Sequence, residues 1–170
     1  IWLTSQDTGC YGFDLGTNVA ALIRELVSIP GNFKIRLGMG NPVHILKFKD
    51  ELLPLFNHDK MFRFLHLPLQ AGSDEVLQEM RRGNSAEQWV SLVQEARLAV
   101  PGITIATDII VGFPTETEQD YWDTLNVVRK TTPEVINISK FWARSKTPAA
   151  KLKPLPGEVV THRAKVLMDM

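Results

Sequence analysis

Cysteine is nearly absent from this sequence, because its 170 residues include only Cys10. A single thiol excludes an internal disulfide framework and favours a reducing compartment, so we expect a cytoplasmic protein. Apolar runs long enough to span a membrane are missing, and no basic segment leads into a secretory signal. The glycine-rich motifs GxGxxG and GxxxxGK[ST], which bind dinucleotides and phosphates, do not occur. The chain begins with Ile1 and not with methionine, so we interpret it as a piece of a longer protein.

Net charge is also absent, but the charges are unevenly distributed along the chain. Residues 1–128 hold ten Lys or Arg and sixteen Asp or Glu, a balance of −6, and residues 129–170 hold nine and three, a balance of +6. A basic end on a neutral domain is suited to binding a polyanion. A solvated surface gives the same pattern, so the charge pattern alone leaves both interpretations open.

Apolar residues, which make up 44% of the chain, recur in alternating strand-like and helix-like patterns. The strand-like segments are 1–7, 33–39, 62–69, 103–113 and 134–143. The helix-like segments are 17–29, 44–57 with Pro54 as a break, 73–81, 85–100, the stretch from Thr115 past Val128, and 158–170. This alternation predicts βα units and a parallel α/β sheet. A closed or partial barrel and an open doubly wound sheet both fit.

Helix starts are indicated by polar side chains that satisfy free backbone amides. Ser73 is a candidate N-cap, and Ser85 with Gln88 forms a possible capping box. Thr115 with Glu118 forms a second possible box. The predicted buried faces are Trp89, Val93, Ala96 and Val100 in one helix and Trp122, Leu125 and Val128 in the next. The four tryptophans fall mostly at such core-like positions, which argues against a base-stacking surface.

Polar residues gather where the predicted strands end. They are Ser5, Gln6, Asp7, Gly38, Asn41, Gln70, Ser73, Asp108, Gly112 and Arg144. In parallel sheets the carboxyl ends of the strands carry the ligand site, so this set predicts a binding rim. The same residues could instead cap helices and tie loops, and that interpretation is the stronger one for Ser73. For Asp108 a functional role is favoured, because an unpaired carboxylate inside an apolar strand is costly.

Glycine and histidine positions add weaker indications. Gly72 and Gly112 lie just past strand ends, where glycine permits positive φ or close approach of the backbone to a ligand. His66 lies within a strand, and we expect it in or near the core. His44 shows no metal-ligand spacing with Cys10, so we expect no metal site in this chain.

Five segments in order resemble the radical S-adenosylmethionine (SAM) methylthiotransferases. They are "LTSQDTGCYGFDLGTN", "RLGMGNPVHI", "FLHLPLQAGSDEVLQEMRRG", "TDIIVGFPTETEQDYWDTL" and "FWARSKTPAA". The first two are most similar to the archaeal and eukaryotic branch of this family, which acts on N6-threonylcarbamoyladenosine at position 37 of tRNA. The resemblance spans nearly the whole chain.

The resemblance implies a partial (βα)6 TIM-like barrel with a [4Fe–4S] cluster held by a CxxxCxxC loop after the first strand. It implies that SAM is cleaved to a 5′-deoxyadenosyl radical and that a methylthio group replaces hydrogen at adenine C2. Members also carry an N-terminal domain with a second cluster and a C-terminal TRAM domain. A cluster loop needs three thiolates, and this chain has one cysteine. We therefore expect residues 1–170 to be a fragment of the radical SAM core domain, covering strands two to six, with no cluster of its own.

The same resemblance assigns roles to individual residues. It implies cofactor binding by Ser5, Gln6, Asp7, Gln70, Ser73, Asp108, Gly112 and Phe113, and substrate binding by Arg144 with Lys151 and Lys153 of the basic end. Asp108 would face the barrel interior, the backbone at Gly112 and Phe113 would meet the adenine, and Gln70 would meet the ribose. Two positions depart from the family pattern, Thr115 in place of glycine and Ser145-Lys146 in place of Pro-Gly. Both loops could therefore have a different shape.

Alternatives remain open for the parent protein. One is a methylthiotransferase for isopentenyladenosine tRNA or for an aspartate of a ribosomal protein. Another is a non-catalytic tRNA-binding or scaffold domain. If the first βα unit is missing, the edge of the second strand is exposed, and exposed edges invite self-association.

Overall fold

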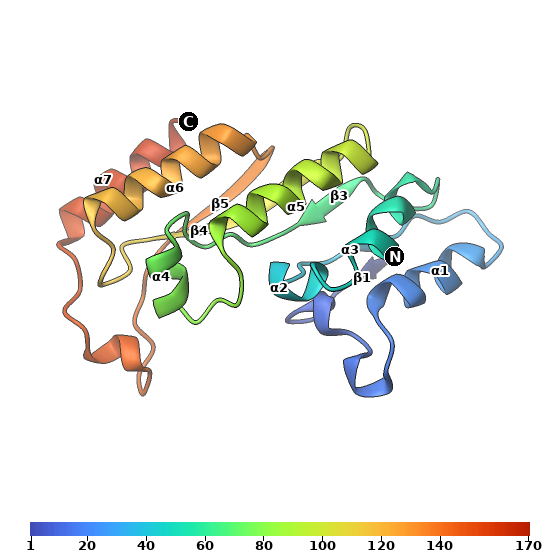
Figure 1. Cartoon of the computed structure of the whole chain (residues 1–170), viewed down its shortest axis with the longest axis horizontal. Coiled ribbons are helices and arrows are strands. Elements are labelled where there is room, and N and C mark those ends of the chain that lie inside the picture. Colours follow the sequence, from blue (N-terminus) through green and yellow to red (C-terminus); the bar gives the residue numbers. More distant parts are fainter.

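The computed structural model describes residues 1–170 as five short strands that alternate with helices (Figure 1). The strands are β1 (Trp2–Leu3), β2 (Arg36–Leu37), β3 (Phe64–His66), β4 (Thr104–Val111) and β5 (Val135–Lys140). The α-helices are α1 (Val19–Ser28), α2 (Pro42–Ile45), α3 (Lys49–Leu52), α4 (Asp74–Glu79), α5 (Ala86–Ala99), α6 (Glu118–Thr131) and α7 (Gly157–Met168). Short 3₁₀ helices are η1 (Thr8–Cys10), η2 (Phe13–Leu15), η3 (Leu53–Asn57) and η4 (Pro148–Lys151).

All strand pairs are parallel, as the alternating pattern predicts. β1 pairs with β2, and β3, β4 and β5 form a second sheet in that order. A single parallel bridge between Ile35 and Met61 connects the two sheets. The strands thus follow one another in chain order, and β1 and β5 do not pair with each other. The α/β class and the parallel pairing are confirmed, whereas the partial barrel stays a prediction. None of the helices combines the length and the apolar character that crossing a membrane requires.

The sequence predicts a helix over 44–57 with a break at Pro54. The structure has a series of short helices there instead. Helix α2 begins after Asn41, whose side chain accepts a hydrogen bond from the Val43 amide, and its first residue is Pro42. Helix α3 follows, and Pro54 lies in the first turn of η3. Proline has no amide hydrogen, so it fits a helix start and interrupts a longer helix.

The expected start of the sixth helix is wrong by two residues. The capping box is formed by Thr117 and Asp120, whereas the Ser85 and Gln88 box of α5 is confirmed. The Thr115 hydroxyl instead donates to Glu79 at 2.6 Å. Of the helix's predicted buried face, Leu125 and Val128 are buried as expected and Trp122 is not. Tyr121 lies in the core with 3% exposure, while Trp122 is 45% exposed.

The apolar core is divided among three clusters. The largest has 22 buried residues and joins β1–β3 to α1, α3, η3 and α5, and Trp89 is among its fully buried members. A second cluster packs β4 and β5 against α6 and α7, which lie side by side in Figure 1. A third packs α4 against Phe113. The second and third clusters surround the carboxyl ends of β4 and β5 and so support the candidate site.

Candidate functional site

Two cavities open at the carboxyl ends of the strands, where the sequence pattern predicts a ligand site. The first has a volume of about 550 Å³, and we call it the polar cavity; its lining includes Gln6, Asp7, Asn41, Gln70, Arg82 and Asp108. The second has a volume of about 430 Å³, and we call it the aromatic cavity; its lining includes Arg81, Ile110, Phe113, Phe141, Trp142 and Pro148. Arg82 and Arg144 line both, so they lie at the junction of the cavities.

Asp108 is held at the polar cavity by its two neighbouring strands. Its carboxylate lies 3.0 Å from His66 Nε2 of β3 and accepts a hydrogen bond of 2.8 Å from Asn137 Nδ2 of β5. Asp108 and Asn137 are direct partners in the parallel register. Burial alone would raise the pKa of Asp108, but the hydrogen bonds from His66 and Asn137 outweigh it and hold the pKa below its usual value. Asp108 is therefore an anion at neutral pH, and its side chain is 29% exposed.

Replacing His66 with leucine should raise the pKa of Asp108. A carboxyl group with a depressed folded-state pKa adds stability that is present above its unfolded pKa and lost as pH falls through its folded pKa. In the variant this loss should begin at a higher pH than in the wild type. The measurement is a carbon NMR titration of the Asp108 carboxyl group, with the exposed His162→Leu as control. An unchanged Asp108 pKa would show that His66 does not stabilise the anion.

Asp7 is fixed by the backbone on which it lies. One carboxylate oxygen accepts hydrogen bonds from the amides of Gly9 at 2.8 Å and Asn41 at 3.0 Å, and the other lies 2.9 Å from His44 Nδ1. The structure also brings Cys10 to this pair, with ligand atoms of all three side chains within 4.8 Å of one another. The sequence spacing did not predict this grouping. Since both Asp7 oxygens already have partners, we interpret the group as a capped turn that presents Asp7 to the polar cavity.

Gln70 adopts a backbone conformation that is uncommon for any residue except glycine. Its φ is +75°, and β4 holds it on both sides: its amide donates to the Asp108 carbonyl at 2.8 Å, and its carbonyl accepts from Ile110 at 2.9 Å. Strained residues of this kind concentrate at functional sites. Gln70 is 6% exposed and lines the polar cavity, and its side-chain amide has no hydrogen bond within the chain. The amide is therefore available to a ligand hydroxyl.

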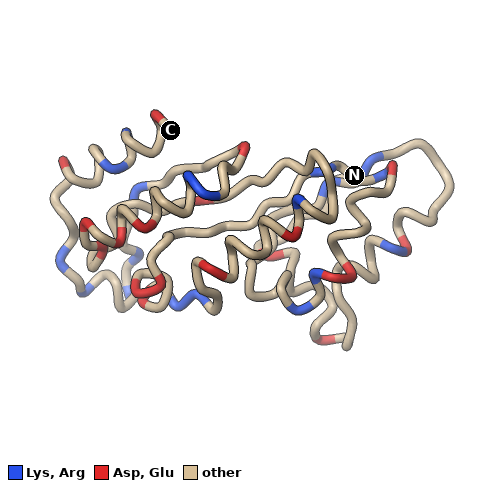
Figure 2. The backbone as a smooth tube through the Cα atoms, turned by 45° about the horizontal axis from the view of Figure 1, so that its top comes forward, with Lys and Arg blue, Asp and Glu red and all other residues tan.

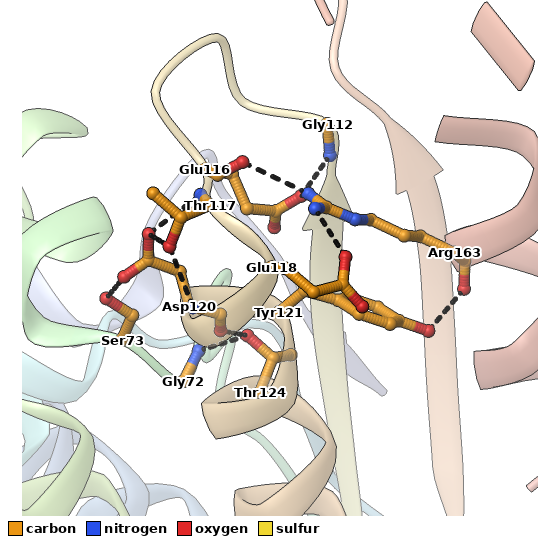
Figure 3. A network of polar contacts seen from close by, with 10 residues as sticks. All are labelled: Gly72, Ser73, Gly112, Glu116, Thr117, Glu118, Asp120, Tyr121, Thr124 and Arg163. Carbon is orange, nitrogen blue, oxygen red and sulfur yellow. Dashed lines mark hydrogen bonds and ion pairs between the residues drawn. The ribbon is translucent and has the colours of Figure 1, made fainter. Parts of the chain in front are cut away.

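The turn that follows β4 is held by the network drawn in Figure 3. Gly112 has φ +82°, and its amide donates to Glu116 Oε2 at 2.9 Å. Arg163 of α7 donates to the same carboxylate oxygen at 2.6 Å, and both side chains are almost completely buried. A side chain at Gly112 would lie 2.6 Å from Val160. The Gly112 amide is thus already occupied, so of the two backbone groups expected to face a ligand only the Phe113 amide is free.

Gly72 allows close packing against a helix and has no role toward a ligand. A Cβ atom there would lie 2.5 Å from the Cα of Thr124 in α6, and the Gly72 amide donates to the Thr124 hydroxyl at 2.8 Å. The close approach that the sequence indicates at Gly72 is therefore an approach to a helix. The neighbouring Ser73 is 2% exposed and caps α4, and its hydroxyl also reaches the Asp120 carboxylate. Ser73 lines neither cavity, so its predicted contact with a cofactor has no support in the geometry.

Aromatic side chains give the second cavity its character. The Phe113 and Phe141 rings pack edge to face with centroids 5.0 Å apart, and Trp142 is 85% exposed. The expectation that the tryptophans lie mostly in the core is therefore wrong, since only Trp89 does. Trp142 follows the end of β5, where no helix covers it, and its ring offers a flat face to a planar ligand.

The remaining predicted residues divide into two groups. Gln6, Asp7, Gln70, Asp108, Phe113 and Arg144 line the cavities, whereas Ser5, Gly112, Lys151 and Lys153 do not. Lys151 and Lys153 are exposed on the loop between β5 and α7, where Figure 2 shows several basic residues together. Arg82, His66 and Asn137 were missed as site residues. Arg82 follows α4 and so has no strand-end signal, but Asn137 could have been found from its alternation with Ile136 and Ile138.

The chain matches the radical SAM superfamily over residues 4–128. The probable threonylcarbamoyladenosine tRNA methylthiotransferase of Pyrococcus horikoshii is 46% identical over 167 residues, which make up 98% of this chain and 39% of that protein. Its human counterpart is 45% identical over 168 residues, 98% of this chain and 29% of that protein. Among solved structures, Escherichia coli coproporphyrinogen III oxidase (HemN), a radical SAM enzyme, is similar with a TM-score of 0.66. The match covers 89% of this chain and 35% of that chain. Because the sequence identity is 20%, this similarity concerns the fold alone. The sequence match, the fold and the cavities at the strand ends agree: the chain belongs to the radical SAM superfamily.

Proposed function

We propose that the chain is the core part of a tRNA methylthiotransferase that modifies N6-threonylcarbamoyladenosine at position 37. The observation that carries this proposal is the identity of 41–46% to archaeal and eukaryotic threonylcarbamoyladenosine tRNA methylthiotransferases over nearly the whole chain. The chain spans 39% of the Pyrococcus horikoshii protein and 29% of the human one. The activity is therefore proposed for the longer protein to which such a core belongs.

The polar cavity has side chains that suit SAM, which when bound supplies a radical that abstracts hydrogen. Asp7 and Asp108 carry negative charge suited to an ammonium or sulfonium group, and Gln70 has a free amide for a ribose hydroxyl. The residues of this chain do not fit a [4Fe–4S] cluster, because one cysteine cannot replace the three thiolates that a cluster needs. We propose that cluster ligands lie outside residues 1–170 and that the chain is a domain fragment covering strands two to six.

The loop between β5 and α7, which carries several basic residues, suits tRNA as a partner. Lys151 and Lys153 are exposed there and belong to the part of the chain with a balance of +6. Lysines that neutralise phosphates give affinity without sequence preference. We propose a cytoplasmic location for the longer protein. The outer edge of β1 has no partner strand, and Trp2 within this strand is 61% exposed, so we propose that the isolated chain self-associates there.

Asp108→Asn and Gln70→Ala, made in the full-length protein, should each weaken SAM binding about 5- to 150-fold. The estimate follows from roughly 1–3 kcal/mol for a hydrogen bond whose buried partner is left without one. Iron content should stay unchanged, because cysteine thiolates hold such a cluster and neither residue is a cysteine. The measurement is a calorimetric titration with SAM and an iron assay on the same samples.

Lys151→Ala and Lys153→Ala serve as the opposite control. They should weaken tRNA binding and reduce its salt dependence while leaving SAM affinity unchanged. Normal SAM binding by Asp108→Asn would make Asp108 a structural residue. The proposed reaction is tested by mass spectrometry of tRNA nucleosides from a strain that lacks the gene. Intact methylthiolated threonylcarbamoyladenosine in that strain would argue for another substrate or for a non-catalytic role.

A further inference from the structure

The arginines of the chain divide by whether the protein supplies them with a partner. Of the nine, six form a hydrogen bond, an ion pair or a stacking contact with an aromatic ring. The guanidinium groups of the other three have no such contact. These three are Arg81, Arg82 and Arg144, and all of them line the aromatic cavity. The concentration of free guanidinium groups at one cavity indicates a site for an anion.

Arg82 is the least solvated of these three. Burial lowers the pKa of its guanidinium, while the carboxylates of Asp108 and Asp7 act in the opposite direction. Neither carboxylate is bonded to Arg82, because His66 and Asn137 bind Asp108, and His44 and the backbone bind Asp7. The one hydrogen bond of Arg82 is from its backbone amide to the Leu77 carbonyl, at 2.8 Å. A partly desolvated cation without an acceptor is stabilised when a ligand supplies one.

Arg144 lines the same junction and comes from a different part of the chain. It lies beyond β5, and its carbonyl accepts hydrogen bonds from the amide of Thr147 at 3.3 Å and from its hydroxyl at 2.7 Å. This turn fixes the backbone and leaves the guanidinium free. Arg144 and Arg82 both border the two cavities, whereas Arg81 borders the aromatic cavity alone. Two planar forks at one junction suit a small oxyanion that is bound by paired hydrogen bonds.

We infer that Arg82 and Arg144 form a carboxylate-binding site that recognises the threonyl carboxylate of the substrate nucleoside. The inference rests on the proposed function and names the residues that select its substrate. Phe141 and Trp142 give the adjoining cavity flat apolar surfaces for the base, and Arg82 and Arg144 line the same cavity where it meets the polar one. An isopentenyl group has no carboxylate and would leave both arginines without an acceptor. Sites built for a charged or hydrogen-bonding group discriminate strongly against analogues that lack it.

The test removes the charge from the ligand and from the protein in turn. The ligands are an anticodon stem-loop RNA that carries threonylcarbamoyladenosine and the same RNA with the threonyl carboxylate as its methyl ester. The proteins are full-length wild type, Arg82→Met and Arg144→Gln. The control is Arg129→Met, because Arg129 stacks on Trp122 and lines neither cavity. Esterification should weaken binding to wild type and to Arg129→Met roughly 10- to 100-fold. For Arg82→Met and Arg144→Gln this difference between the two RNAs should largely disappear.

Further measurements separate this site from other sources of an anion. SAM affinity, measured in parallel, should be unchanged in both variants; if it alone falls, the arginines bind the carboxylate of SAM and the inference is wrong. If both RNAs weaken equally and the salt dependence falls, the contact is to phosphate, and the inference is again wrong. Arg82→Lys, which keeps the charge without the fork, should retain part of the discrimination. A wild-type protein that binds neither RNA would refute the proposed function itself, whereas wild-type binding without an effect of the ester would refute only this inference.

Discussion

Arg163→Met is expected to lower the free energy of unfolding by roughly 3–5 kcal/mol, the range for breaking one partner out of a buried ion pair. The reason is the Glu116 carboxylate, which has 1% side-chain exposure and would keep only the Gly112 amide as partner. Arg163 also donates to the Glu116 carbonyl at 3.2 Å, so the backbone of the turn loses a donor as well. The measurement is unfolding by urea, followed by circular dichroism.

Two further variants identify the cause. Arg24→Met removes an ion pair with Glu51 in which both side chains are 51% exposed, and it should cost less than about 1 kcal/mol. The double variant Arg163→Met, Glu116→Gln should recover much of the loss, because it removes the buried charge together with its partner. If Arg163→Met costs no more than Arg24→Met, the network in Figure 3 does not stabilise the turn.

The loss in Arg163→Met should also depend on pH. Burial already raises the pKa of Glu116 above its usual value, although the Gly112 amide and Arg163 oppose the shift. Without Arg163 that pKa should rise further. A carboxyl group with a raised folded-state pKa loses stability as pH rises from its unfolded pKa through its folded pKa. The difference between variant and wild type should therefore be smallest in acid and grow toward neutral pH.

Gly72→Ala should lower the free energy of unfolding by about 1–3 kcal/mol, as overpacking typically does. The new methyl group would lie 2.5 Å from the Thr124 Cα and 2.8 Å from both the Asp123 carbonyl oxygen and the Thr124 amide nitrogen. These are backbone atoms of α6, so they cannot move aside as a flexible side chain would. Helix α6 would have to shift as a unit, which would also weaken the 2.8 Å hydrogen bond from Gly72 to Thr124.

Gly157→Ala is the matched control for this change. Gly157 is the first residue of α7, and a Cβ atom there has no neighbour within 4 Å. Alanine at a compatible helical position is neutral or stabilising by up to about 1 kcal/mol. Thermal unfolding of both variants gives the comparison. Equal stability of the two would mean that α6 does not pack against Gly72 as closely as described.

Local sequence signals predicted the order of elements because each βα unit satisfies them within a short stretch. Ser85 and Gln88 form their capping box within one helical turn, and Trp89 lies on the predicted face. The same reasoning failed at Thr115, whose partner is the distant Glu79. Glu116 likewise does not cap the helix start, because its carboxylate pairs with Arg163, 47 residues later in the chain. No local pattern contains a contact of that separation.

The sequence predicted those residues of the candidate site that lie at the ends of strands. Asp108 and Gln70 follow apolar strands, and the structure places both at the polar cavity. Arg82 lies after a helix in a segment rich in charge, where nothing local distinguishes it from a solvated arginine. His66 was expected as a near-core residue. Its partner Asp108 lies on the next strand, and the sequence alone does not give the alignment of strands that brings the two side chains together.

The polar row formed by His66, Asp108 and Asn137 has a consequence for how the sheet chooses its pairing. Successive side chains of a strand point to opposite faces, so a slip of one residue would exchange Asp108 with Ile109, which is fully buried beneath the helices. The misaligned sheet would then place a carboxylate among apolar side chains, without the donors of the adjacent strands. Burial of an unpaired ion costs several kcal/mol. The residues that shape the ligand cavity therefore also penalise the nearest wrong alignment of β4, which ties the specificity of folding to the chemistry of the site.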